Sequence, residues 1–415
     1  MKNTVEPDQA IEQGEKISNP EVRWVDQESS PKTIVSGQVA HVLYVIDQLC
    51  QLGGAERVLL EIIRRLPPDR FRCSVVTFQI GPAMKALENG SFPIQVLPLR
   101  RTYDIGAIKT AVQIRDLIRR ENVSIVHTFF ETSDLWAAPV AKMSGCPLLV
   151  SSRRDMGILR TLKHRLAYPI VNRLFDRILT VSEEVRSYAL NHDHLPPQRV
   201  ETLYNGVDLE ALDAKAAENS ARLNLGINPT SVVVSTLANI RYVKGIDVLA
   251  RAAARIRPTH PDVVFLVIGA VLEPETFRKL QALIDSLGIK DNFRFLGARS
   301  NPFPILAASD VFCLPSRNEG FSNALVEAMG SRLPCVATRV GGNAEALKEG
   351  VNGFLVESED ADAMADRILR LLRDPKLRRG MGQAARQTVE SHFSMNAMMN
   401  RLADIYQELL AVKDA

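Results

Sequence analysis

The chain has 415 residues and a formal net charge of +3, a length that gives room for roughly two to three domains. Hydrophobic residues make up 46% and charged residues 24%, which is typical of a globular protein and excludes a disordered chain or a small disulfide scaffold. The longest apolar run, 263–272, is shorter than the about 18 residues of a membrane span. The small net charge predicts no nucleic-acid partner.

Five cysteines are spread along the chain without a CxxC pair. Most of them lie beside apolar stretches, which favours reduced, buried thiols over zinc ligands or disulfides. We therefore expect a cytoplasmic protein without disulfides. The cysteines are Cys50, Cys73, Cys146, Cys313 and Cys335.

Residues 1–38 are polar and lack periodicity, so we expect a flexible N-terminal extension. Their scattered charges and the lack of an apolar core argue against a secretory signal. The folded part of the chain is expected to begin near residue 39.

From residue 39 to 208, short apolar runs alternate with stretches of helical periodicity. Runs of about four to six apolar residues separated by helices predict a parallel sheet that is covered on both faces. The predicted strands are HVLYVI, CSVVTF, SIVHTF, PLLVSS and RILTVS, and the clearest helices are AERVLLEIIRRL and IGAIKTAVQIRDLIRR. This segment is the first predicted domain.

The alternation breaks at residues 209–229, which are predicted to connect two domains. It restarts in residues 230–393, where the predicted strands are SVVVSTL, VVFLVIG, FRFLG, VFCLP, PCVAT and GFLV. Residues 394–415 are predicted to form a helix that packs back on the first domain. We expect an α/β fold of two tandem doubly wound, Rossmann-like domains, with the ligand in the cleft between them at the carboxyl ends of the strands.

The first predicted strand is followed by the paired glycines Gly53 and Gly54. Such a pair lets the backbone approach a ligand closely, although a tight strand-to-helix turn needs the same residues. The chain contains neither the GxGxxG fingerprint nor the P-loop sequence, which argues against P-loop phosphoryl transfer.

Residues 153–177 contain seven Lys or Arg against two Asp, which predicts either a site for an anionic partner or a solvated basic face. Within them, residues 157–175 mix Leu, Ile, Val and Tyr with cations, as interfacial membrane helices do. Pro169 interrupts the helical pattern, and the same apolar residues could instead cover the sheet. Contact with an anionic surface, at the inner face of the cell membrane, and packing inside the domain both stay open.

Two cations, Arg241 and Lys244, lie in segment 239–245 at the start of a predicted helix. The helix dipole disfavours positive charge there by about 0.3–1 kcal/mol for each cation. A bound anion would remove this conflict, and so would solvation of the two side chains.

Segment 319–330, EGFSNALVEAMG, follows the predicted strand VFCLP and contains the start of a helix. Ser322 or Asn323 is expected to cap this helix, whose free N–H groups favour an anion. Glu327 stands on an otherwise apolar stretch, and its carboxylate needs donors from ligand hydroxyls or from a structural partner. With Glu319 beside the helix start, this segment and segment 239–245 suit a diphosphate bound in one cleft.

Two acidic motifs have structural interpretations. His192, Asp193 and His194 precede Leu-Pro-Pro in a predicted surface loop, so we do not take them as metal ligands. Asp360 and Asp362 open a predicted helix, where carboxylates are favoured, so we prefer helix capping to a metal-binding DxD motif. We therefore predict no metal site.

Together these motifs resemble glycosyltransferase family 4, whose members are retaining enzymes of the GT-B fold that use nucleotide-sugar donors. The most specific sign is the pair Glu319 and Glu327, with seven residues between them. Supporting motifs are YNGVD at 204–208, NIRYVKG at 239–245, FLG at 295–297 and GGNAEAL from Gly341. The resemblance covers residues 42–410.

The resemblance implies that residues 230–393 bind the donor, a UDP- or GDP-sugar. Lys244 would contact its diphosphate, and Arg241 would supply the second charge because Asn239 stands where the family commonly has arginine. Glu319 would hold the transferred sugar and Glu327 the ribose. The backbone that would meet the sugar and the phosphates is that of Gly53, Gly54, Gly320, Phe321, Ser322 and Asn323.

The resemblance also implies that residues 39–208 form the acceptor side, for a glycan or a lipid-linked precursor. Arg153 stands where the family often has histidine, and it would hold a phosphate of the acceptor. The family mechanism needs no metal, and no cofactor besides the donor. The expected activity is retaining transfer of a sugar to a hydroxyl group. The alternatives are a nucleotide-sugar epimerase and a non-catalytic protein that binds sugar nucleotides.

Overall fold

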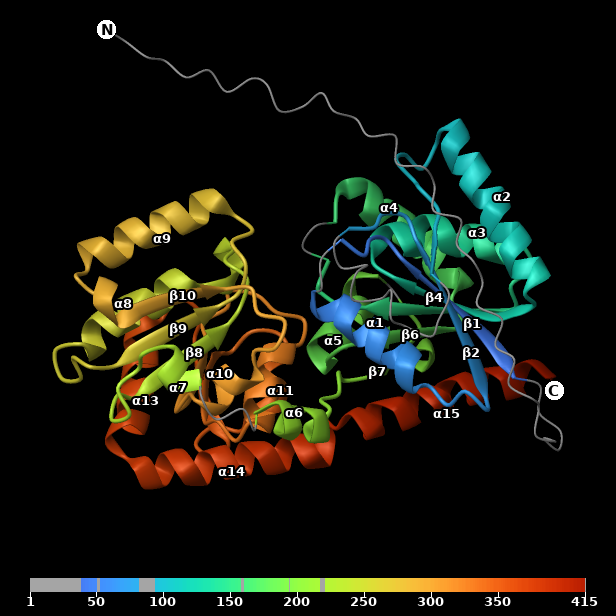
Figure 1. The fold of residues 1–415 in the computed structure, drawn as a ribbon. Coiled ribbons are helices and arrows are strands. Elements are labelled where there is room, and N and C mark those ends of the chain that lie inside the picture. The colour runs from blue at the N-terminus through green and yellow to red at the C-terminus, as the bar shows by residue number, and fades with distance from the viewer. Residues whose placement is uncertain are drawn as a thin grey trace, which may run out of the picture.

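The computed structural model describes residues 39–50, 53–81, 94–157, 160–193, 195–216 and 221–414. The N-terminal extension predicted for residues 1–38 lies outside these ranges. The described chain forms two α/β domains, each built on one parallel sheet with flanking helices, and a long helix returns from the second domain to the first (Figure 1). The predicted fold class is confirmed.

Within the described ranges, the first sheet has seven parallel strands in the order β3-β2-β1-β4-β5-β6-β7. Every residue of the central strand β1 is buried, because β2 and β4 flank it and both faces are covered. The five predicted strands are confirmed, but β3 and β7 have three residues each, too few for a recognisable apolar run. The strands are β1 Ala40–Ile46, β2 Phe71–Thr77, β3 Ile94–Val96, β4 Val123–Phe129, β5 Leu148–Arg153, β6 Arg177–Thr180 and β7 Val200–Thr202.

The helices of the first domain follow from their apolar periodicity and caps. In α1, the buried positions Val58, Leu59, Ile62 and Ile63 recur at helical spacing and form one apolar face. The start of α5 is capped by Ser182, whose hydroxyl accepts a hydrogen bond from Val185 N at 3.2 Å. The helices are α1 Gly54–Arg65, α2 Ile105–Arg120, α3 Ala138–Met143, α4 Leu162–Val171 and α5 Glu183–His192.

The second sheet has six parallel strands among the described residues, in the order β10-β9-β8-β11-β12-β13. All six were predicted from apolar runs. Because β8 lies in the middle and the chain crosses from β10 to β11 on its other side, the loops after β8 and β11 meet at the carboxyl edge of the sheet. The strands are β8 Val233–Leu237, β9 Val264–Ile268, β10 Phe293–Gly297, β11 Val311–Leu314, β12 Cys335–Thr338 and β13 Gly353–Val356.

The helices of the second domain include two in the predicted connection 209–229, where Leu212 of α6 is buried in a core cluster with Leu325 of α11. The predicted capping role of Asp360 is confirmed, because its side chain accepts a hydrogen bond from Ala363 N at 2.8 Å. The helices are α6 Leu209–Ala216, α7 Ala221–Asn224, α8 Ile246–Ile256, α9 Pro274–Ser286, α10 Phe303–Ala307, α11 Asn323–Gly330, α12 Asn343–Ala346, α13 Ala361–Arg373 and α14 Pro375–His392.

The last helix, α15 (Met395–Asp414), packs against the first sheet although it follows the second domain (Figure 1). Leu402, Ile405 and Tyr406 of this helix are fully buried in one cluster with Tyr44 of β1. The hydroxyl of Tyr406 lies 3.1 Å from that of Tyr44 and 2.6 Å from Nδ1 of His127. The end of the chain therefore completes the core of the first domain.

Candidate active site

The loop between β11 and α11 carries the glutamate motif of the second domain. The predicted cap is Ser322, whose hydroxyl accepts a hydrogen bond from Leu325 N at 3.4 Å. The first N–H groups of α11 have no partner within their own helix, and the helix dipole favours a negative ligand there. The ring of Phe321 packs against those of Tyr204 and Phe393 with centroids 5.3 Å apart, so only its backbone can meet a ligand.

Lys244 lies in the short turn that follows β8 and pairs with Glu319. Its Nζ donates a hydrogen bond to Oε1 of Glu319 at 2.7 Å, and the hydroxyl of Ser316 donates to the same oxygen at 2.7 Å. The side chain of Lys244 is 26% exposed and that of Glu319 is 10% exposed. The structure thus joins a cation and a carboxylate from loops that are 75 residues apart in the sequence.

Gly245 determines how closely this turn approaches the end of β11. Its φ of 62° lies in the left-handed region, and a Cβ on it would stand 1.9 Å from the carbonyl oxygen of Pro315. Both the dihedral angle and the lack of space exclude a side chain, so the fold requires glycine at this position. The contact brings Lys244 to the loop that carries Glu319.

Three predicted donor residues lie on the same two segments. Arg241 is exposed. Oδ1 of Asn239 accepts a hydrogen bond from Ala270 N at 2.9 Å, so the side-chain oxygen is bound to the loop after β9. Glu327 is half-buried on α11, next to the buried residue Val326. The ligand contacts proposed for these three residues stay predictions.

We call residues 315–323, the loop between β11 and α11 with the first residue of α11, the donor loop after its predicted role. The predicted glycine pair of the first domain contacts this loop of the second domain. Gly53 is the N-cap of α1, and a Cβ on it would lie 2.5 Å from the carboxylate of Glu56. The carbonyl oxygen of Gly54 accepts a hydrogen bond from Nδ2 of Asn323 at 3.2 Å, so the starts of α1 and α11 are neighbours. Burial raises the pKa of the Glu56 carboxyl, and the positive charge of Arg154 partly offsets this rise.

Arg154, the residue after β5, also lies at this contact between the two domains, which we call the junction. Its Nη2 donates to Oδ1 of Asn205 at 2.8 Å, and Nδ2 of Asn205 donates to Oδ1 of Asn323 at 2.6 Å. Its carbonyl oxygen is so close to Gly320 that a Cβ there would lie 2.1 Å away. Burial lowers the pKa of the Arg154 guanidinium to about 10, which still leaves it charged near neutral pH. A cation of the first domain therefore lies beside the donor loop.

Arg153 does not offer the exposed cation that the sequence predicted for an acceptor phosphate. Its side chain is 3% exposed, and its Nη1 lies 3.1 Å from Oδ2 of Asp134. Its Nη2 donates to Oδ1 of Asn172 at 2.8 Å, and its guanidinium lies 4.2 Å from the centre of the Tyr168 ring. Asp134 compensates the charge of Arg153 inside the domain, so Arg153 is a poor candidate for binding an acceptor phosphate. Arg154 is the better candidate for a cation that faces the cleft.

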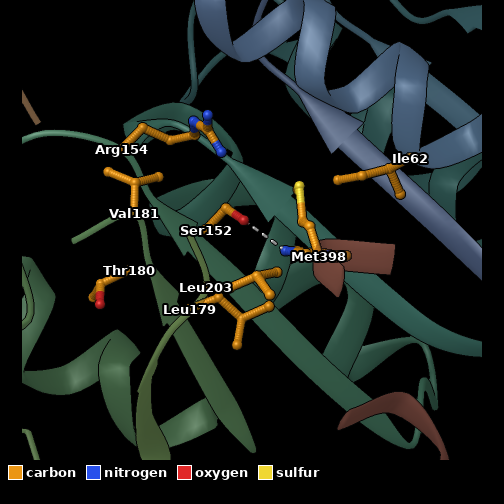
Figure 2. Close-up of a pocket in the computed structure, with 9 residues that line it drawn as sticks. Ile62, Ser152, Arg154, Leu179, Thr180, Val181, Leu203 and Met398 are labelled. Carbon is orange, nitrogen blue, oxygen red and sulfur yellow. Dashed lines mark hydrogen bonds between the residues drawn. The ribbon is translucent and has the colours of Figure 1, made fainter. Parts of the chain in front are cut away.

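A small pocket beside Arg154 is lined by residues of several elements, among them Ser152 of β5, Val181 after β6 and Met398 of α15 (Figure 2). Nε2 of His127 lies 2.9 Å from the hydroxyl of Ser152, in the hydrogen bond drawn in Figure 2. Burial, reinforced by the charge of Arg154, lowers the pKa of His127 to about 3. The neutral histidine thus connects α15 to the strand that ends next to Arg154.

Glu345 of α12 holds the two domains together on the other side of the donor loop. Its carboxylate accepts hydrogen bonds from Glu183 N at 2.8 Å, Glu184 N at 2.9 Å and the hydroxyl of Tyr204 at 2.8 Å. Since Glu183 and Glu184 begin α5, the negative charge also lies at a favourable helix end. Nearby, the hydroxyl of Ser182 donates to the carbonyl oxygen of Gly320 at 2.9 Å.

The basic segment 153–177 divides into a buried and an exposed part. The side chains of Arg153 and Arg160 are buried, and Arg154 is half-buried. In α4, Tyr168 and Val171 are buried, as expected if the helix covers the sheet. Three apolar residues one turn apart are instead at least 68% exposed, and three cations accompany them: Leu162, Leu166 and Ile170, with Lys163, Arg165 and Arg173.

Asp193 does not lie in an exposed loop as predicted. Its side chain is buried, and both of its oxygens accept hydrogen bonds from Nη1 of Arg160 at 2.9 Å.

In the ranges that the structure describes, no group of three or more His, Cys, Asp or Glu residues is arranged to hold a metal ion. No helix in those ranges has both the length and the apolar character of a membrane span.

Four residues of the junction were not predicted: Glu56, Arg154, Asn205 and Glu345. Glu56 lies two residues after the glycine pair, and Arg154 directly follows the arginine that was chosen. Asn205 and Glu345 belong to the motifs YNGVD and GGNAEAL, which served only as family signs. Their place in these motifs was a usable signal, but it does not show that Asn205 binds Asn323 and Glu345 binds the start of α5, both across the two domains.

Two family models match the chain in adjacent segments. Residues 52–211 match the model described as Glycosyltransferase Family 4. Residues 218–388 match the model described as Glycosyl transferases group 1. The two matches follow the two domains in turn.

The chain is 29% identical over 318 residues to N-acetyl-alpha-D-glucosaminyl L-malate synthase of Bacillus anthracis, which spans 74% of this chain and 80% of that protein. It is 25% identical over 373 residues to UDP-Gal:alpha-D-GlcNAc-diphosphoundecaprenol alpha-1,3-galactosyltransferase of Escherichia coli, which spans 87% and 95%. Anabaena HepE, solved in complex with UDP, superposes with a TM-score of 0.77 at 21% identity, covering 88% of this chain and 99% of that one. This last likeness is one of fold.

Proposed function

This chain belongs to glycosyltransferase family 4, and from that premise we propose retaining transfer of a sugar from a UDP-sugar to a hydroxyl acceptor. Glycosyl transfer is supported over the epimerase alternative, because both matching family models and the named galactosyltransferase are described as transferases. The preference for UDP rests on the donor named for that galactosyltransferase and on the UDP held by HepE.

The observation that carries the proposal is the meeting of Lys244, Glu319 and two helix starts at one junction. Lys244 pairs with Glu319 at 2.7 Å, and Asn323 at the start of α11 contacts Gly54 at the start of α1. A cation and two helix N-termini stabilise the negative charge of a diphosphate. Glu319 offers a carboxylate to the hydroxyls of the sugar, as the family resemblance implies.

In this proposal the bond between the anomeric carbon and the diphosphate oxygen breaks as the acceptor oxygen bonds to the same carbon. The acceptor attacks from the face that the diphosphate leaves, so the configuration is retained, and its proton passes to the departing phosphate oxygen. Lys244 and the N–H groups of α11 stabilise the charge that develops on the diphosphate. Donors of this kind typically contribute about 2.7–4 kcal/mol each to catalysis.

The donor assignment is tested by thermal unfolding with a panel of nucleotides and nucleotide sugars. UDP and a UDP-sugar should raise the unfolding midpoint, because a ligand at about 100 times its dissociation constant adds about 2.7 kcal/mol of stability. GDP and ADP serve as matched controls and should have little effect. A larger shift with GDP would reassign the base, and no shift with any nucleotide would contradict the proposed donor site.

We expect the transfer activity to survive an excess of EDTA, because Lys244 and the helix starts supply the positive charge for the leaving group. The measurement is release of UDP from the donor in the presence of acceptor, with and without chelator. Loss of activity on chelation that added Mg²⁺ or Mn²⁺ restores would overturn the metal-independent mechanism.

We also propose that α4 contacts an anionic membrane surface, which would bring the site to a lipid-linked acceptor. The support is the exposed stripe of Leu162, Leu166 and Ile170 with the cations that flank it. Each cation near an anionic bilayer contributes about 1 kcal/mol. Figure 1 shows α4 on the side of the first domain that is away from α15.

Co-sedimentation with vesicles tests this contact. The protein should pellet with anionic vesicles at low salt, and less at high salt or with neutral lipids. Leu166→Asp should reduce pelleting, whereas Leu223→Asp, at an exposed apolar position of the second domain, should not. Equal and negligible pelleting under all conditions would favour a soluble acceptor.

A further inference from the structure

Glu345 of α12 in the second domain completes the start of α5, which lies on the side of the first domain that faces the second (Figure 1). The first N–H groups of an α-helix have no partner within their own helix. In α5, the hydroxyl of Ser182 accepts a hydrogen bond from Val185 N. The N–H groups of Glu183 and Glu184 are bound by the two carboxylate oxygens of Glu345, at 2.8 and 2.9 Å. These two hydrogen bonds therefore exist only while the domains keep this arrangement.

The charge of Glu345, a half-buried residue, is compensated by groups of the first domain. The positive end of the α5 dipole faces its carboxylate. The hydroxyl of Tyr204 donates to the same carboxylate at 2.8 Å. Burial and this hydrogen bond raise the pKa of the Tyr204 hydroxyl, which keeps its proton at neutral pH. The neighbouring carboxylate of Glu183 pairs with Arg186 at 3.2 Å, and this pairing reduces its repulsion of Glu345.

Glu345 is connected to the donor loop through the glycines that precede α12. The N–H of Gly342 donates to the carbonyl oxygen of Gly320 at 2.9 Å, and the hydroxyl of Ser182 donates to the same oxygen at 2.9 Å. A Cβ on Gly342 would stand 2.8 Å from the Cβ of Ser182 and 2.6 Å from the ring of Phe321. The starts of α5 and α12 and the donor loop are thus packed tightly together, and a shift of Glu345 relative to α5 would also move Gly320.

The donor loop carries the groups whose placement matters for the proposed reaction. Gly320 lies against the carbonyl oxygen of Arg154, at the end of β5 in the first domain. Glu319, the preceding residue, pairs with Lys244. A displacement of about 1 Å between reacting groups can lower a rate by about 100-fold. A small change in the contact between the domains is therefore enough to slow transfer.

We propose that Glu345 is a positioning residue for sugar transfer: by capping α5 across the domain boundary, it sets the placement of the donor loop against the first domain. Its removal slows the attack of the acceptor on the donor, which is the step that requires both domains. Nucleotide binding depends on Lys244 and the start of α11, both within the second domain, and is retained. This inference rests on the proposed function, because the reaction that is positioned is the proposed transfer.

The first test compares Glu345→Ala and Glu345→Gln in the release of UDP from a UDP-sugar with a neutral glycoside acceptor. Glu345→Ala should lower kcat by about 10- to 100-fold, the effect of a small misplacement of reacting groups. Glu345→Gln keeps the length of the side chain and one of the two oxygens, so its kcat should lie between those of the unaltered protein and Glu345→Ala. The affinity for UDP, measured by calorimetry, should stay unchanged in both variants.

Glu357→Ala is the matched control for Glu345→Ala. That glutamate also belongs to the second domain, but it is 73% exposed and pairs with Arg339 on the surface. Its loss should change neither kcat nor the affinity for UDP, because exposed ion pairs contribute little.

The second test measures hydrogen exchange at the start of α5 and needs no substrate. In Glu345→Ala, the amides of Glu183 and Glu184 should exchange faster by about 10-fold or more, the effect of losing a hydrogen bond to a charged group. The amides within α9, at the far side of the second domain, should exchange as in the unaltered protein. Unchanged exchange at both glutamates would show that Glu345 does not cap α5 in solution and would overturn the inference.

Tyr204→Phe tests the third hydrogen bond of Glu345. Phenylalanine keeps the ring that packs against Phe321 and Phe393 and removes only the hydroxyl. The variant should lower kcat by about 3- to 10-fold, the scale of a single hydrogen bond. Combined with Glu345→Ala it should cause no further loss, because the partner of the hydroxyl is already absent. Fully additive losses would contradict a shared role of these two residues.

The outcomes separate a positioning role from a structural one and from failure of the proposed function. Faster exchange at the start of α5 together with an unchanged kcat would show that Glu345 only stabilises the helix, and would overturn the positioning role. Failure of the unaltered protein to bind any nucleotide would refute the proposed function itself, and that result does not depend on the Glu345 variants.

Discussion

Lys244→Ala should weaken UDP binding by about 1.5–3 kcal/mol, the range of hydrogen bonds to charged groups. The substitution removes the cation at the donor loop and leaves Glu319, which is 10% exposed, with the hydroxyl of Ser316 as its remaining hydrogen-bond donor. The uncompensated carboxylate then repels the diphosphate. Because the same charge stabilises the leaving group, turnover should fall by about 100-fold or more as well.

Calorimetry with UDP and steady-state kinetics measure the two effects of Lys244→Ala. Lys279→Ala is the matched control, because that lysine is 76% exposed and pairs with Glu275 on the surface of α9. Arg241→Ala, alone and combined with Lys244→Ala, tests whether the exposed arginine supplies the predicted second charge. Wild-type affinity in a folded double variant would show that the diphosphate binds elsewhere.

Gly320→Ala should lower kcat/KM by about 100-fold while both domains stay folded, since a displacement of about 1 Å at a reacting centre has this scale of effect. The added Cβ would stand 2.1 Å from the carbonyl oxygen of Arg154, and neither backbone can yield without moving one domain against the other. The clash lies between the domains, so the two cores are unaffected. The hydrogen bond from Ser182 to the Gly320 carbonyl should be displaced as well.

Gly380→Ala is the control for this substitution. Gly380 lies inside α14, and a Cβ on it has no atom within 4 Å. Alanine there should keep full activity and stabilise the protein by roughly 0.5–1 kcal/mol through its higher helix propensity. If Gly320→Ala keeps wild-type kcat/KM, the close contact between the donor loop and Arg154 is not needed for catalysis.

The fold could be predicted because its strands are continuous apolar runs separated by amphipathic helices. Strands of a parallel sheet that is covered on both faces appear in the sequence as short, nearly continuous apolar runs. The edge strands β3 and β7 were missed, since three residues carry too little pattern. The return of α15 to the first domain agrees with the sequence expectation, although its partner His127 lies far away in the chain.

The donor side could be predicted because its residues occur in dense local motifs. Lys244 with its Gly245, and Glu319 with Ser322, lie on loops that parallel strand order brings together. The residues of the acceptor side were harder to predict. Arg153 is the last residue of β5 and Arg154 follows it, so the local sequence does not distinguish them, and the choice depends on the buried Asp134 that pairs with Arg153.

The contacts that join the domains could not be predicted from local pattern. Glu345 binds the start of α5 in the other domain, and Asn205 connects Arg154 of its own domain to Asn323 of the other. Their residue types fit many surface positions equally well. Only the relative placement of the domains gives them a role.

The most direct test of the proposed reaction is the anomeric configuration of its product. The UDP-sugar with the largest thermal shift, in its α form, is incubated with a neutral glycoside acceptor, and the new linkage is determined by proton NMR. Retaining transfer at the junction of Lys244, Glu319 and Arg154 predicts an α-linked product that Lys244→Ala forms far more slowly. A β-linked product would contradict the retaining mechanism that we propose.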